Sequence, residues 1–148
     1  MSAEIILASG LLATTFAKEV VVVTTTSIYS LIIGIISHEY KNISDTLEEM
    51  DIYSQIKIIN SFITNIDEKN MKGHDALQLA VNDVYNCVLN IHKELEYINE
   101  KCESHKKSWF YYLYKLDCSK ELKNLDKHYK VLSKRFDLLM KIFPTSRY

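Results

Sequence analysis

The chain has 148 residues, of which 47% are apolar, so it is the size of one domain and too apolar to be intrinsically disordered. Three glycines and one proline leave residues 35–143 almost free of helix-breaking residues, which predicts long helices joined by short connections. The net charge of −1 hides an uneven distribution, because residues 115–147 carry a net +5 and the remainder carries −6.

The first predicted element is an apolar segment from residue 5 to residue 37. Its second half, Val20–Ser37, is uncharged and just long enough to be a transmembrane candidate. Four interpretations stay open: a core helix of a bundle, a helix that inserts into a bilayer under some trigger, a permanent single span at 20–37, and a secretory signal. The acidic Glu4 argues against the signal. We expect a helix over about residues 3–37, with small residues every four positions at Ser9, Ala13 and Ala17.

The second predicted helix covers about residues 38–67. Its apolar stripe begins with Ile43, Leu47 and Met50 and then shifts phase, which indicates a bend or a local change of twist. The polar joint that follows precedes Asp75, which we expect to cap the next helix. After the shift the stripe consists of isoleucines: Ile52, Ile56, Ile59, Ile63 and Ile66.

Two longer apolar series predict helices over about residues 75–105 and 119–142, the second ended by Pro144. A repeat of about 3.5 residues keeps one stripe facing partner helices over many turns, as in coiled coils. The sequence therefore predicts an all-α fold, an up-down four-helix bundle that forms a single domain over residues 1–148. We expect its core to contain Leu77, Val81, Val84, Val88, Ile91, Leu95, Ile98, Leu122, Leu125, Leu132, Phe136 and Leu139.

The joint before the last helix, Lys106–Lys115, is an aromatic cluster bounded by lysines. Tryptophan and tyrosine between lysines suit a membrane–water interface, and they also suit stacking on single-stranded nucleic acid. The alternative is a short segment that plugs the end of the bundle, with Trp109 and some tyrosines buried.

The last predicted helix is basic, and basic helix faces bind anionic lipid or phosphate. The alternative is a solvated face whose lysines meet acids on neighbouring helices. Together with the aromatic joint, the candidate lipid-binding residues are Lys106, Lys107, Trp109, Lys115, Lys123, Lys127, Lys130, Lys134 and Arg135.

A search for catalytic motifs finds no glycine-rich phosphate loop, no H-E-x-x-H and no G-x-S-x-G. Cys102 and His105 could share a helix face, but two ligands do not make a metal site. We therefore expect no enzyme, no metal, no cofactor and no small-molecule substrate. Three cysteines without a C-x-x-C pair fit a reducing compartment, so we expect a cytoplasmic protein, peripheral at membranes.

The order of these features resembles a known family over residues 75–142. The quoted residues are Ala76-Leu77…Val81…Val84, the joint Lys106-Lys107-Ser108-Trp109-Phe110, and Lys120-Glu121-Leu122…Leu125…Leu132…Phe136-Asp137-Leu138-Leu139. This pattern, after an apolar first helix, resembles the N-terminal bundle of the mixed-lineage kinase-domain-like family and the related HeLo-type cell-death and adaptor domains. The resemblance implies a four-helix bundle in necroptosis-like or immune signalling that oligomerises and associates with anionic lipids. It also implies a fused regulator; because these residues carry none, a truncated executioner, a decoy and a fragment all stay open.

We therefore expect a non-enzymatic bundle that binds protein partners, further copies of itself included. It would engage anionic membranes through its apolar N-terminus and basic last helix, whereas nucleic acid is disfavoured as a partner. Two alternatives remain: a soluble oligomerising or inhibitory module, and a membrane-anchored protein with a span at 20–37.

Overall fold

The computed structural model describes residues 11–66, 68–109 and 113–147, and in these ranges every regular element is helical. The all-α class expected from the sequence is thereby confirmed. The helices are α2 (Leu11–Ser37), α3 (Lys41–Met50), α4 (Ile52–Thr64), α5 (Glu68–Met71), α6 (Asp75–Lys107) and α7 (Ser119–Arg147).

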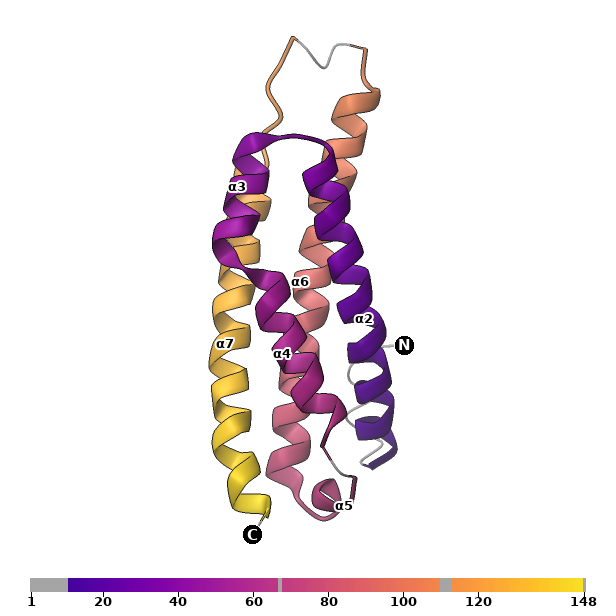
Figure 1. Cartoon of the computed structure of the whole chain (residues 1–148), viewed down its shortest axis with the longest axis vertical. Helices are drawn as coiled ribbons and strands as arrows, with labels where there is room; N and C mark the ends of the chain where they lie inside the picture. The colour runs from indigo at the N-terminus through magenta and orange to yellow at the C-terminus, as the bar shows by residue number, and fades with distance from the viewer. Residues whose placement is uncertain (1–10, 67, 110–112, 148) are drawn as a thin grey trace.

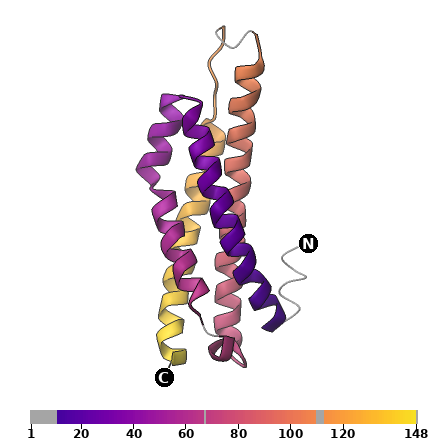
Figure 2. The ribbon, with the colours of Figure 1, turned by 45° about the vertical axis from the view of Figure 1, so that its right-hand side comes forward.

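The long helices lie side by side along the long axis of the molecule (Figures 1 and 2). The chain runs along the axis in α2, returns through α3 and α4, runs forward again in α6 and returns in α7. α6 packs against both α2 and α7, and α4 packs against α2. α4 also contacts α7, because the Phe62 ring of α4 meets the rings of Phe136 and Phe143 of α7 edge to face. The ring centroids are 5.6 and 5.0 Å apart.

The expected continuous helix over residues 38–67 is wrong, because Asp51 breaks it into α3 and α4. Asp51 has φ 51° and ψ 41°, the left-handed conformation that ends a helix, and its N–H donates to the carbonyl of Glu48. Aspartate tolerates this conformation better than most residues. The break lies where the apolar stripe shifts from Met50 to Ile52, so the bend indicated by the phase shift is present.

Other helix ends also differ from the sequence expectation: α3 begins at Lys41 and α4 ends at Thr64, each three residues inside the expected bounds of 38 and 67. His74, not Asp75, caps α6, because its Nδ1 accepts a hydrogen bond of 3.1 Å from the Leu77 N–H. α6 also continues to Lys107, one half-turn beyond the expected end. α7 continues through Pro144 to Arg147, since proline has a helical φ and removes only one backbone hydrogen bond near the end of a helix.

The residues of the long apolar series form one continuous core. Every residue expected there is buried except Leu122, which is partly buried and packs against the others. The five isoleucines from Ile52 to Ile66 are buried as well. Cys87, Cys102 and Cys118 are buried free thiols.

The inner face of α2 belongs to the same core. Ile28, Ile32 and Ile35 are buried in the cluster that α4 and α6 share, as the core-helix interpretation of this segment expects. Among the helical residues that the structure describes with their side chains, none forms a helix long and apolar enough to cross a bilayer. The expected start of the helix near residue 3 and the small residue Ser9 lie outside the described residues.

Candidate functional site

The connection between α6 and α7, residues 108–118, is called the tip loop because it projects past the α2–α3 connection at one end of the molecule (Figure 1). Trp109 is 74% exposed, Leu113 65% and Tyr114 53%. Lys106, Lys107 and Lys115, which flank these residues, are also exposed. The interpretation of this segment as a plug with Trp109 buried is therefore wrong for Trp109. Phe110, Tyr111 and Tyr112 lie outside the described residues.

A buried imidazole anchors the tip loop to the α2–α3 connection. The Tyr40 hydroxyl donates a 2.6 Å hydrogen bond to His105 Nδ1, and His105 Nε2 donates a 3.0 Å hydrogen bond to the Tyr114 carbonyl. The rings of Tyr40 and Tyr114 both meet the His105 ring edge to face, and the Lys106 ammonium lies 5.5 Å from the centroid of the Tyr40 ring. One side chain therefore holds both connections at this end of the molecule.

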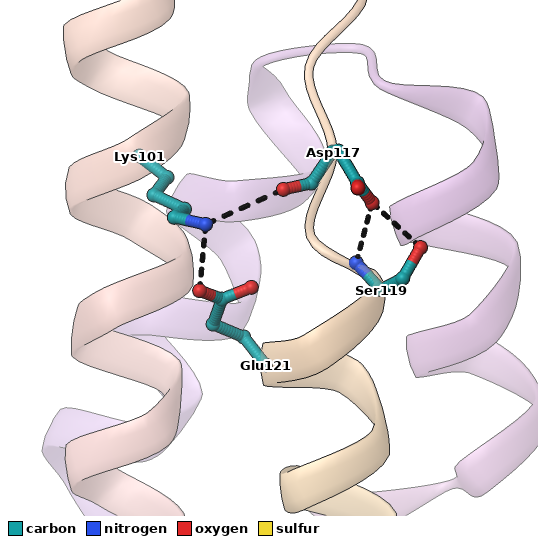
Figure 3. A network of polar contacts seen from close by, with 4 residues as sticks. All are labelled: Lys101, Asp117, Ser119 and Glu121. Atoms are coloured by element: carbon teal, nitrogen blue, oxygen red, sulfur yellow. Dashed lines mark hydrogen bonds and ion pairs between the residues drawn. The ribbon is translucent and has the colours of Figure 1, made fainter.

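A second polar network holds the other end of the tip loop (Figure 3). Lys101 Nζ lies 2.6 Å from a carboxylate oxygen of Glu121 and donates to the Asp117 carbonyl. The Asp117 carboxylate accepts hydrogen bonds from the Ser119 hydroxyl (2.6 Å) and the Ser119 N–H (3.0 Å). Asp117 thereby supplies a hydrogen-bond acceptor to the first N–H of α7, and the contact of Lys101 with Glu121 ties α7 to α6.

The pKa values of these groups follow from the same contacts. The Glu121 carboxylate bonded to Lys101 raises the pKa of that ammonium. The Ser119 hydroxyl and N–H lower the pKa of Asp117. Burial alone would raise the pKa of Glu121, but the Lys101 hydrogen bond and the residue's own backbone N–H outweigh it, so this pKa is lowered. All three groups are therefore held in their charged forms at neutral pH.

The lysines of α7 form a second surface, separate from the tip loop. Because an α-helix turns by about 100° per residue, lysines spaced by three and four residues share one face, here opposite the buried series. This lysine stripe runs along the side of the molecule for about 30 Å, whereas the tip loop lies at one end of the molecule. The residues expected to bind lipid therefore form two separate surfaces. The stripe consists of Lys120, Lys123, Lys127, Lys130, Lys134 and Lys141, all exposed.

Two of the basic residues expected to bind lipid have acidic neighbours. Arg135 Nη1 lies 3.8 Å from Asp83 Oδ2 of α6, and this contact places Arg135 beside the α6–α7 seam and not on the lysine stripe. Lys130 Nζ lies 2.8 Å from Asp126 Oδ2, one turn earlier on α7. The interpretation of the basic face as residues that meet acids on neighbouring helices therefore holds for Arg135, whereas the acid beside Lys130 lies on α7 itself.

The structure also joins three residues that the sequence does not connect. Ser27 Oγ of α2 lies 2.7 Å from His92 Nε2 of α6, and His92 Nδ1 lies 2.7 Å from Glu96 Oε1. A serine hydrolase has the same order of groups, but Ser27 lies within a helix, where neighbouring N–H groups bond to helix carbonyls and do not stabilise an oxyanion. These contacts join α2 to α6 through polar side chains.

No group of three histidine, cysteine or acidic side chains with the geometry of a metal site occurs in the described part of the chain. Cys102 and His105 share the inner face of α6, but both nitrogens of His105 are engaged by Tyr40 and Tyr114.

Comparison with known proteins finds a similarity to the uncharacterized protein L717 of Acanthamoeba polyphaga mimivirus, 35% identical over 77 residues. The match covers 52% of this chain and 37% of the viral protein's own length. No protein-family model matches the chain. No solved structure matches it.

Proposed function

We propose that this protein is a non-enzymatic helical module that docks on anionic membranes with the tip loop as the contact. The observation that carries the proposal is the exposure of Trp109 and Leu113 between exposed lysines at one end of an elongated molecule. Tryptophan is enriched at the membrane–water interface, and lysines beside it attract anionic headgroups.

The magnitudes support reversible binding. Three lysines near an anionic surface contribute about 1 kcal/mol each. Burying a large apolar side chain such as Trp109 or Leu113 contributes about 1.5–3 kcal/mol, and part of the total is lost to the cost of association. This sum corresponds to a peripheral protein that leaves the membrane when salt screens the lysines.

Docking through the tip loop needs no rearrangement of α2. Insertion of α2 would first expose Ile28, Ile32 and Ile35, each costing about 1.5–3 kcal/mol. We therefore propose that the tip loop makes the first contact with the membrane. Release of α2 from the core would be a separate step that needs its own trigger.

We further propose that the helices form an up-down four-helix bundle in which α3 and α4 together serve as the second member. The alternating chain path supports this proposal. The resemblance to HeLo-type cell-death and adaptor bundles motivates a role as a signalling module on the cytoplasmic side of a membrane.

Vesicle flotation tests the docking proposal. The protein should float with vesicles that contain phosphatidylserine and stay below neutral phosphatidylcholine vesicles. The variants Lys106→Glu with Lys107→Glu, and Trp109→Ala, should each reduce flotation at least about five-fold, since each removes more than 1 kcal/mol of attraction. A control with Lys57→Glu and Lys72→Glu makes the same charge change on exposed residues away from the tip loop. Equal flotation of all variants would refute the proposal.

A second candidate function is a soluble oligomerising or inhibitory module. It is favoured by the charges on the outer faces of α3 and α7, which are opposite in sign and lie next to each other.

A further inference from the structure

The outer face of α3 is acidic. Asp45, Glu48 and Glu49 are exposed and lie on the side of α3 opposite Ile43 and Leu47, which are buried. In the described part of the chain none of these three carboxylates has a cation within ion-pair distance. Lys41 is also exposed, so α3 carries three acids and one base on its exposed positions. Glu48 lines a pocket with Ile32 and Ile36 of α2, and the acidic row on the outer face of α3 is therefore Asp45 and Glu49.

This acidic row lies directly beside the lysine stripe. α3 packs on α7, and a groove of about 700 Å³ runs between their outer faces. Thr46, Glu49 and Met50 line it from α3. From α7 it is lined by Asp126, Tyr129, Lys130, Ser133 and Lys134, and Asp126 is paired with Lys130 within α7. Glu49 of α3 is therefore at the same level along the long axis as Lys130 and Lys134 of α7, across a groove that contains the partly buried side chains of Met50 and Tyr129.

We infer that this face is a two-fold dimer interface whose partner is a second copy of the chain. Rotation by 180° about an axis that runs along the groove, parallel to the helices, exchanges the two sides of the face and keeps every level along the axis. It places α7 of one copy on α3 of the other, and the same contact forms twice, as in any isologous interface. Lys127 and Lys134 of each copy then face Asp45 and Glu49 of its partner, while Met50 and Tyr129 from both copies meet at the centre.

The same geometry disfavours other partners for the lysine stripe. A flat anionic bilayer or a nucleic-acid strand laid on the stripe would also meet the acidic row of α3, which repels phosphate. A surface on which an acidic row lies beside a basic row is complemented by a surface with the opposite order, and the rotated copy supplies that order. The inference does not rest on membrane docking, because the tip loop is not part of this face.

Sedimentation velocity on the full chain tests the inference. We expect dimers at about 50 mM NaCl, and a dissociation constant at least about ten-fold higher at 500 mM, because the Debye length falls from roughly 14 Å to roughly 4 Å. Exposed ion pairs are individually weak, so the effect depends on several pairs acting together. A monomer at both salt concentrations would overturn the inference.

Charge reversal supplies a sharper test. One variant carries Lys127→Glu and Lys134→Glu, so both rows are acidic; the other carries Asp45→Lys and Glu49→Lys, so both rows are basic. Each variant alone should be monomeric, and an equimolar mixture should form heterodimers, because each acidic row then meets a basic row. The matched control, Lys57→Glu with Lys72→Glu, should dimerise like the wild type.

Circular dichroism checks that both variants fold, and their exposed positions leave the core unchanged. A mixture that stays monomeric, or reversed variants that dimerise alone, would refute the two-fold arrangement. Both variants retain the tip loop, so they should still float with anionic vesicles. Loss of dimers and loss of membrane binding are thus separate results.

Discussion

Replacing Tyr40 by phenylalanine should destabilise the protein through His105. The change removes the hydroxyl that donates the 2.6 Å hydrogen bond to Nδ1 and leaves this nitrogen without that donor in a side chain that is 7% exposed. A buried acceptor deprived of its donor costs about 1–3 kcal/mol. Tyr40 is only partly buried, so water can approach the site after the hydroxyl is removed, and we expect a cost in the lower half of this range. We expect a loss of about 1–2 kcal/mol in the free energy of unfolding.

Urea unfolding followed by circular dichroism measures this loss, which corresponds to a fall in Tm of about 2–8 °C for a chain of this size. Tyr53→Phe is the matched control, because the Tyr53 ring stacks on Tyr29 and its hydroxyl makes no hydrogen bond in the described residues. A double-mutant cycle with His105→Gln isolates the coupling between Tyr40 and His105. If Tyr40→Phe costs no more than Tyr53→Phe, the imidazole does not anchor the two connections and the reasoning fails.

Three further predictions concern acid sensitivity, aromatic packing and thiol reactivity. The pKa of Asp117 is lowered in the folded protein, so its ionised carboxylate stabilises the fold above the ordinary carboxyl pKa of 3.8. This stabilisation is lost as the pH falls through the lower folded pKa, and Asp117→Asn should therefore make the free energy of unfolding depend less on pH in acid. Phe62→Leu removes the edge-to-face contacts with Phe136 and Phe143 and should cost about 1–3 kcal/mol in urea unfolding. Burial raises the pKa of Cys102 to about 12, so iodoacetamide at mildly alkaline pH should label it about 1,000-fold more slowly than an exposed thiol.

Each of these predictions has a control on the same chain. Glu100→Gln replaces an exposed carboxylate of α6 that is outside the proposed dimer face. If it flattened the dependence of stability on pH as much as Asp117→Asn does, the first prediction would be contradicted. Ile58→Leu alters an exposed apolar residue of α4, and an equal cost for Phe62→Leu would show that the ring contacts add nothing. In guanidinium the three cysteines should react alike, and fast labelling of Cys102 in the native protein would mean that α6 opens readily.

Periodic apolar residues carry most of what can be predicted about this fold. The series from Leu77 to Ile98 predicts the inner face of α6 because helical spacing is a local property, and apolar residues that share one helix face are the ones that the fold buries. The phase shift between Met50 and Ile52 locates the break, but not its cause, since a left-handed Asp51 leaves no signature in composition. The cap at His74 is missed because aspartate is the commoner capping residue.

The functional surfaces depend on distant residues and could be predicted only in part. The aromatic cluster is visible in the sequence, but the exposure of Trp109 depends on how far the tip loop projects past the neighbouring helices. The contact of Tyr40 with His105 joins positions 65 residues apart. Pairing with Asp83 separates Arg135 from the lysine stripe, and this pairing depends on the register of α6 against α7.

Fluorescence of Trp109, the only tryptophan in the chain, tests membrane docking by the tip loop most directly. On addition of phosphatidylserine-containing vesicles its emission should move to shorter wavelength and become quenched by brominated acyl chains, with no change on neutral vesicles. Lys106→Glu with Lys107→Glu should abolish the shift. Protein that floats with anionic vesicles while Trp109 keeps the emission and quenching of the free protein would contradict the proposal that the tip loop enters the membrane interface.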